Sequence, residues 1–356
     1  MGGFKFKPEK VLTELSQFSE QLLQSVHTLQ QLDEIQVGQT PKEIIYREDK
    51  LQLFHYQRDE THQTQLGKPL LICYALVNRP YMVDLDRRRS FIKRLLALGL
   101  DIYLIDWGYP DAADRYLDMD DYINGYLANC VDQVLKDSGQ DQLNLLGICQ
   151  GGTLSLCYTA LNPDKVKNLI TMVTPVDFKT PDNMLSHLAQ QIDIDLAVNT
   201  YGNIPGAMLN DAYNALMPMR LGLQKNLNTP RKLQNTASAL NYLRMEKWIN
   251  DSPDQAGEMF RQFLTSFFKQ NSFINNTTVV GDRCVDLQQI TQPLLNVFGS
   301  SDHLVPPSAS RALKGLTRSE DYHEYEVASG HIGVFVSEKS QSEVAPKLAN
   351  WLKQHE

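Results

Sequence analysis

One five-residue turn constrains this chain more than any other feature of its sequence. Residues 147–151 read Gly-Ile-Cys-Gln-Gly, after an apolar run that predicts a short buried strand and before a predicted helix over 153–161. A strand, a sharp turn and a helix form the setting of a nucleophile elbow, in which flanking glycines let the backbone bend. We therefore expect Cys149 to be a nucleophile where most such elbows carry serine. The alternative is an inert, buried cysteine in an ordinary turn.

Apolar and amphipathic segments alternate on both sides of this turn. Strands are expected over 69–77, 101–107, 143–146, 168–173, 293–298 and 322–327. Helices are expected over 90–98, 122–135, 153–161, 308–316 and 344–352. Such alternation implies parallel strands joined by helical crossovers. With a predicted hairpin over 43–57 in front, this is the order of an α/β-hydrolase fold, with a mostly parallel central sheet flanked by helices.

The alternation stops between residues 177 and 285, where prolines and helical segments replace it. We expect a largely helical cap or lid there, which would keep water from an acyl intermediate. The predicted organisation is an N-terminal helical segment over 1–40, a core made of 41–176 and 286–356, and the cap over 177–285. The amphipathic stretch 9–32 either packs on the protein's own core or binds a partner or a surface.

Two further reactive residues lie in the loops that follow predicted strands. Asp302 comes after the strand over 293–298, and His331 comes after the strand over 322–327. Catalytic groups of α/β sheets lie at the carboxyl ends of the strands, so we expect both to meet Cys149. The order nucleophile, acid, histidine is that of α/β-hydrolases. His331 would take the proton of the thiol, and Asp302 would fix the tautomer of the imidazole.

Backbone N–H groups should stabilise the oxyanion formed during acyl transfer. The expected donors are Gln150, directly after the nucleophile, and Val77 or Asn78 in the loop after the first central strand. We expect His303, next to Asp302, and Asn78 to support the site, since only one histidine can complete the expected order.

A cysteine nucleophile forms a thioester instead of an oxygen ester. Exchange between a thioester substrate and an enzyme thiol is nearly isoenergetic, because the attacking and leaving groups are alike. This favours acyl transfer from coenzyme A over hydrolysis. The runner-up is a cysteine-dependent hydrolase of the dienelactone-hydrolase or thioesterase type.

Composition excludes several other classes of protein. The 356 residues carry a net charge of −8, which argues against nucleic-acid binding. Five scattered cysteines without a CxxC pair point to a reducing compartment. The sequence shows no signal peptide and no apolar run long enough to cross a membrane, so we expect a soluble cytoplasmic protein. No metal-ligand spacing is present, so no metal is expected.

The chain resembles the class III catalytic subunit of polyhydroxyalkanoate (PHA) synthase over nearly its whole length. The stretches that carry this resemblance are 74–82, 103–110, 147–152, 174–178, 302–307 and 330–333. The chain does not depart from the family pattern at Cys149, Asp302 or His331.

The resemblance implies polymerisation of (R)-3-hydroxyacyl-coenzyme A, mainly 3-hydroxybutyryl-coenzyme A, into polyester with release of coenzyme A. Cys149 would carry the growing chain. Coenzyme A would be a product and part of the substrate, so no cofactor is expected. The resemblance also implies a separately encoded companion subunit of the PhaE type and residence on cytoplasmic PHA granules, as a homodimer or a larger hetero-oligomer. Asp302 would either orient His331 or help to deprotonate the monomer hydroxyl.

Overall fold

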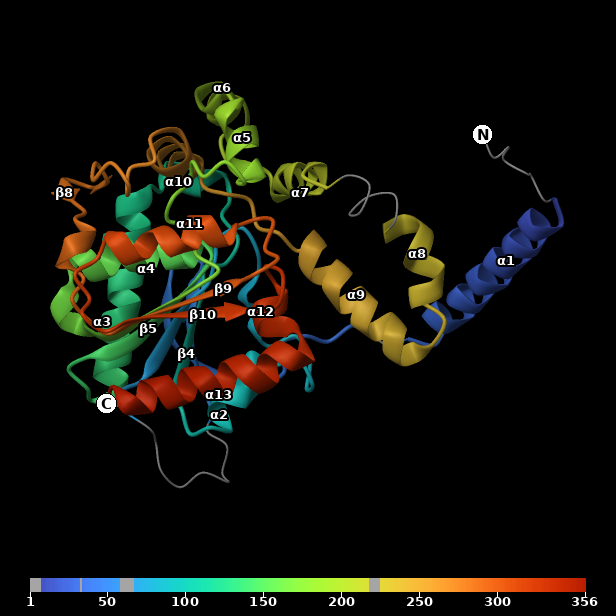
Figure 1. Ribbon diagram of the computed structural model, residues 1–356, viewed down its shortest axis with the longest axis horizontal. Helices are drawn as coiled ribbons and strands as arrows, with labels where there is room; N and C mark the ends of the chain where they lie inside the picture. The colour runs from blue at the N-terminus through green and yellow to red at the C-terminus, as the bar shows by residue number, and fades with distance from the viewer. Residues whose placement is uncertain (1–7, 33, 58–66, 218–224) are drawn as a thin grey trace, which may run out of the picture. The chain divides into compact units, whose positions relative to one another are not determined.

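An eight-stranded sheet forms the centre of the fold in the computed structural model, which describes residues 8–32, 34–57, 67–217 and 225–356 (Figure 1). The strand order is β1-β2-β4-β3-β5-β6-β9-β10. The strands are β1 (Lys42–Glu48), β2 (Leu51–Tyr56), β3 (Leu70–Cys73), β4 (Ile102–Asp106), β5 (Leu143–Ile148), β6 (Val166–Met172), β9 (Leu294–Gly299) and β10 (Tyr322–Val327). β1 and β2 form an antiparallel hairpin, and β2 pairs antiparallel with β4. All pairings from β4 to β10 are parallel, which confirms the predicted fold class.

Helices connect these strands as the alternation predicts. They are α2 (Phe91–Leu96), α3 (Ala128–Ser138), α4 (Gln150–Leu161), α11 (Pro307–Arg311), α12 (Gly333–Val336) and α13 (Glu338–Gln354). The helix expected over 122–135 begins as a π-helical segment, Asp121–Leu127, and continues as α3. The closing helix is longer than expected, because the Ser337 side chain caps it and accepts a hydrogen bond from the amide of Ser340.

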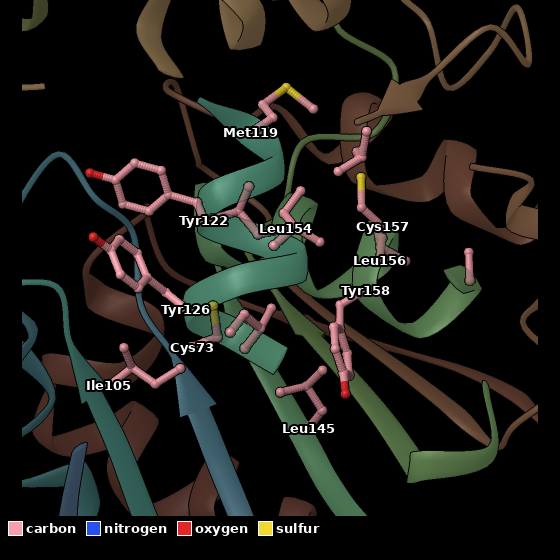
Figure 2. Close-up of a cluster of buried hydrophobic side chains, with 14 of the residues drawn as sticks. Cys73, Ile105, Met119, Tyr122, Tyr126, Leu145, Leu154, Leu156, Cys157 and Tyr158 are labelled. Atoms are coloured by element: carbon pink, nitrogen blue, oxygen red, sulfur yellow. The ribbon is translucent and has the colours of Figure 1, made fainter. Parts of the chain in front are cut away.

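Alternate strand residues face opposite sides of the sheet and build two cores. Cys73, Ile105 and Leu145 belong to a buried cluster with side chains of α4 and of the π-helical segment (Figure 2). Their strand neighbours Ile72 and Leu104 are fully buried but lie outside that cluster, so they face the other side, where α2 contacts β4 and α13. Each large apolar side chain removed from water contributes roughly 1.5–3 kcal/mol, so both faces stabilise the sheet.

The first central strand is shorter than its apolar run. β3 ends at Cys73, and the prediction that it continues to Val77 is wrong. Tyr74 and Leu76 are buried all the same. The indole N–H of Trp107 donates to the carbonyl of Tyr74 at 2.9 Å. A buried backbone group needs a hydrogen-bond partner, and here side chains supply it in place of a neighbouring strand.

The chain divides into two compact units. One comprises Met1–Val37 and Asn210–Asn250, and the other Gly38–Leu209 and Asp251–Glu356. Helices within 177–285 are α5 (Met184–Gln190), α6 (Ile194–Tyr201), α7 (Gly206–Ala215), α8 (Lys225–Lys232), α9 (Thr236–Asn250) and α10 (Gly257–Phe263). The domain boundaries at 40, 176 and 285 remain predictions. The predicted segments 1–40, 41–176 and 177–285 include residues 1–7, 33, 58–66 and 218–224, which lie outside the described residues.

Helix α1 (Pro8–Gln30) contacts α8 and α9 within the first unit but keeps much of its apolar surface open. At least 40% of each of seven apolar residues is exposed: Leu12, Leu15, Phe18, Leu22, Leu23, Val26 and Leu29. By contrast, Ser25 is buried and donates to the carbonyl of Pro230 at 2.9 Å. Within the first unit, α8 and α9 therefore leave the apolar face of α1 uncovered. Among the residues that the structure describes, no helix combines the length and apolar character needed to cross a lipid bilayer.

Candidate active site

Cys149 lies at a strained bend between β5 and α4. Its φ of 55° and ψ of −123° fall where residues with a side chain are rarely found. The amide of Cys149 donates to the carbonyl of Met172 at 2.9 Å, which ties the bend to β6. The residue is partly exposed, whereas Cys73, Cys130 and Cys157 are buried. The structure thus has the strand, bend and helix of a nucleophile elbow.

The glycines on either side of Cys149 allow the backbone to approach closely at this bend. A Cβ atom at Gly151 would lie 2.2 Å from the carbonyl oxygen of Cys73, and one at Gly147 would lie 2.4 Å from the Cα of Gly152. Real side-chain atoms do not approach other heavy atoms so closely. The turn can therefore form only with glycine at both positions, as the pattern predicts.

His331 and Asp302 meet in the loops that follow β10 and β9. The Nδ1 of His331 lies 2.7 Å from the Oδ2 of Asp302. The other carboxylate oxygen of Asp302 accepts hydrogen bonds from the backbone amides of Leu304 at 2.9 Å and Val305 at 3.0 Å. None of the Asp302 side chain is exposed, and only 10% of the His331 side chain is. Both groups are thus held rigidly and away from bulk water.

The third member of the group is Cys149, whose side chain is close enough to His331 to act on its pKa. Burial alone would lower the pKa of His331, but the charges of Asp302 and Cys149, with hydrogen bonds to both, hold its pKa well above the usual 6.5. The positively charged imidazole is therefore favoured between the carboxylate and the sulfur. The structure brings together the three residues that the sequence analysis singled out.

The expected oxyanion donors come from the start of α4 and from the loop after β3. Gln150 is the first residue of α4, where the N–H groups of the first turn have no partner within the helix. Within the described part of the chain, no acceptor is bonded to the amide of Val77. The positive end of the α4 dipole also favours negative charge at this point.

The residues expected to support the site have different surroundings. Asn78 donates from its side-chain amide to the hydroxyl of Ser252 at 2.8 Å, so its side chain is committed to that contact. His303 is partly buried next to Asp302. The sequence did not predict roles for the side chains of Gln150 and Gln255. Both form hydrogen bonds with the backbone of Leu76, from which they lie 74 and 179 positions away in the chain. No local pattern marks such distant contacts.

A group of potential metal ligands lies elsewhere. One ligand atom each from Asp321, His323 and His355 lies within 4.8 Å of the others. Asp321 accepts hydrogen bonds from both imidazoles at 2.7 Å, so the three side chains already satisfy one another. They lie at the amino end of β10, whereas His331 follows its carboxyl end. This group therefore has no part in the chemistry at Cys149.

Comparison with known proteins places the chain in a family. A family model of the alpha/beta hydrolase fold matches residues 68–338, and one of the N-terminus of poly-beta-hydroxybutyrate polymerase (PhaC) matches residues 8–95. The poly(3-hydroxyalkanoate) polymerase subunit PhaC of Allochromatium vinosum is 55% identical over 348 residues, 98% of each chain. This chain belongs to the PhaC family. The family predicted from the sequence is confirmed.

Another PhaC protein supports this assignment, and solved structures share the fold. PhaC of Synechocystis sp. is 50% identical over 357 residues, covering 98% of this chain and 94% of its own. BpoC of Mycobacterium tuberculosis H37Rv, described as a non-haem bromoperoxidase, matches with a TM-score of 0.52 at 11% identity over 83% of this chain and 99% of its own. A structure from work on the metagenome-derived lipolytic enzymes LipS and LipT matches with a TM-score of 0.51 at 12% identity. The match covers 82% of this chain and 96% of its own. At such low identities these structures share only the fold with PhaC.

Proposed function

We propose that this chain polymerises (R)-3-hydroxyacyl-coenzyme A, mainly 3-hydroxybutyryl-coenzyme A, into polyester and releases coenzyme A. Cys149 is the nucleophile, His331 the base, and Asp302 the group that orients it. The observation that carries the proposal is the 2.7 Å contact between His331 and Asp302 beside a cysteine at a strained elbow, in a chain of the PhaC family.

In the first step, His331 removes the proton from the Cys149 thiol, and the thiolate attacks the carbonyl carbon of the acyl-coenzyme A. The raised pKa of His331 favours this transfer, because its neighbours stabilise the protonated ring. The N–H groups of Gln150 and Val77 hold the negative oxygen of the tetrahedral intermediate. The carbon–sulfur bond to coenzyme A then breaks, and the departing thiolate takes the proton from His331.

In the second step, the hydroxyl of another 3-hydroxyacyl group attacks the thioester at Cys149. His331 accepts the hydroxyl proton, an ester bond forms, and the carbon–sulfur bond to Cys149 breaks. The sulfur leaves as a thiolate and recovers a proton from His331. The products are a longer ester chain and an enzyme ready for the next transfer.

The surroundings of Asp302 favour an orienting role over direct action on the monomer. One oxygen bonds to His331, and the other accepts two backbone amides. With no exposed surface, the carboxylate has no free face for a substrate hydroxyl. Asp302 therefore acts through His331, by fixing its tautomer and stabilising its charged form.

We further propose that the protein works in the cytoplasm at the surface of PHA granules, with a PhaE-type companion subunit, in a homodimer or a larger hetero-oligomer. The exposed apolar side chains of α1 support contact with a partner or an apolar surface. Light scattering after size-exclusion chromatography, with and without the companion subunit, tests the assembly. A mass that stays equal to that of one chain in both cases contradicts it.

The activity is tested with purified full-length protein and (R)-3-hydroxybutyryl-coenzyme A, with and without the companion subunit. We expect release of free coenzyme A thiol together with insoluble polyester, and neither from the Cys149→Ala variant. Release of thiol with an equimolar amount of free hydroxyacid would instead identify a cysteine hydrolase. Full activity in the Cys149→Ala variant would exclude the covalent intermediate.

A further inference from the structure

The peptide group that carries one expected oxyanion donor is held by a glutamine from a distant part of the chain. The N–H of Val77 and the carbonyl of Leu76 belong to the same peptide group. The Nε2 of Gln255 donates to that carbonyl at 3.0 Å. On the other side of Leu76, its own amide donates to the Oε1 of Gln150 at 3.1 Å. Both glutamines are buried, with 4% of Gln255 and 9% of Gln150 exposed.

Gln255 belongs to a short segment, residues 251–255, that is hydrogen-bonded to the loop after β3. Ser252 accepts a hydrogen bond from the side chain of Asn78 at 2.8 Å. The carboxylate of Asp251 accepts a hydrogen bond from the hydroxyl of Tyr81 at 2.8 Å and another from the hydroxyl of Tyr109. Several contacts therefore hold this segment against the loop, so the position of Gln255 does not depend on its own side chain.

The backbone of Gln255 is fixed separately. Its amide and carbonyl exchange hydrogen bonds with Ile204, each at 2.9 Å. A substitution at the side chain of Gln255 leaves this pairing intact. The hydrogen bond to Leu76 can thus be removed while the segment stays in place.

We propose that Gln255 is a positioning residue for the oxyanion site, acting through the peptide group between Leu76 and Val77. In a planar trans peptide the N–H points opposite to the carbonyl, so a donor that holds the oxygen also fixes the direction of the N–H. A hydrogen bond to the carbonyl also polarises the peptide and makes its N–H a stronger donor. Gln255 thereby prepares the Val77 amide for the charge that develops on the substrate oxygen. The inference rests on the proposed function, since it assumes acyl transfer at Cys149.

The test replaces Gln255 by Met, which has a similar length but no donor. We expect kcat for coenzyme A release to fall about 10- to 100-fold, somewhat less than the loss of a whole oxyanion donor, with KM changed less than about twofold. The rate at which iodoacetamide alkylates Cys149 should stay unchanged. That displacement reaction forms no oxyanion and depends only on the sulfur and His331, so a general distortion of the site would slow both reactions.

The matched control is Gln292→Met. Gln292 also donates from Nε2 to a backbone carbonyl, that of Pro163 at 2.7 Å, but it lies just before β9 at the opposite end of the strand from Asp302. We expect this variant to keep the kcat of the original protein. If Gln255→Met does not fold, Gln255→Asn keeps the amide but is one methylene too short to reach Leu76, and carries the same expectation.

The outcomes separate the two proposals. If the unaltered protein releases no coenzyme A, the proposed function fails and the inference fails with it. If the unaltered protein is active and the Gln255 variants keep its kcat, the inference alone is wrong. A parallel loss of kcat and of the alkylation rate would also overturn it, because Gln255 would then only support the structure of the site.

Discussion

The Nδ1 of His331 lies 2.7 Å from the Oδ2 of an Asp302 side chain that has no exposed surface. This contact predicts the effect of Asp302→Asn. The asparagine oxygen can still accept the two backbone amides, but its NH₂ group then faces Nδ1 and favours the wrong tautomer of the ring. We expect kcat to fall by about 10³- to 10⁴-fold. KM should change little.

The measurement is coenzyme A release by the variant at saturating substrate. Thermal unfolding serves as the control for folding, since the asparagine has the shape of the aspartate. A variant that retains a tenth or more of the original kcat would contradict the role that we assign to Asp302.

The pKa of His331 predicts a pH-dependent contribution to stability. The folded protein raises this pKa well above 6.5 because Asp302 and Cys149 outweigh the effect of burial. A group whose pKa is raised on folding stabilises the protein fully below its unfolded pKa and loses that contribution as the pH rises through the folded value. The free energy of unfolding of the original protein, relative to His331→Gln, should therefore be largest below about pH 6.5.

Urea unfolding of both proteins from about pH 5 to pH 10 measures this difference in the free energy of unfolding. The range extends about three units above the usual pKa of histidine. The difference should shrink steadily toward alkaline pH. A difference that stays constant, or grows with pH, would mean that His331 is not protonated more readily in the folded state.

How much the sequence predicts depends on where the partners of a residue lie. The bend at Cys149 follows from glycines within five positions, and the strands follow from apolar runs, so both are predictable from short windows. The loop after β3 is different. Its first residues, Tyr74 to Leu76, are buried like those of a strand, but the side chains of Trp107, Gln150 and Gln255 satisfy their backbone. Periodicity predicts burial and does not tell which group satisfies the backbone.

The five cysteines should differ sharply toward an alkylating reagent. Burial raises the pKa of the Cys73 thiol to about 12, and it raises the pKa values of Cys130 and Cys157 as well. Thiolates are the reactive form, so these three should not react at neutral pH. Cys284 is exposed, whereas Cys149 is partly exposed and lies close enough to His331 to raise the pKa of that imidazole.

The experiment uses a Cys284→Ser background, which removes the exposed thiol. Intact-mass and peptide analysis after brief treatment with iodoacetamide should show one modified site, Cys149, and His331→Gln should slow the reaction at that site. Modification of Cys130 at an equal rate would contradict the assignment of Cys149 as an activated nucleophile.

The close approach of Gly151 to β3 predicts a strong effect of a single methyl group. In Gly151→Ala, the new Cβ would lie 2.2 Å from the carbonyl oxygen of Cys73, a backbone atom that cannot move without breaking the pairing of β3 with β5. Overpacking of this kind costs about 1–3 kcal/mol or more. The displaced α4 would also shift Cys149 and the amide of Gln150, so activity should fall further than stability alone explains.

Gly315→Ala is the matched control, because a Cβ at Gly315 meets nothing within 4 Å and the residue lies in the 3-10 turn Ala312–Gly315, away from the elbow. Urea unfolding and coenzyme A release are measured for both variants. We expect the control to keep its stability within about 0.5 kcal/mol, as surface substitutions usually do, and to keep full turnover. If Gly151→Ala were as stable and as active as Gly315→Ala, α4 could not pack against β3 as closely as the structure has it, and the geometry of the elbow would be wrong.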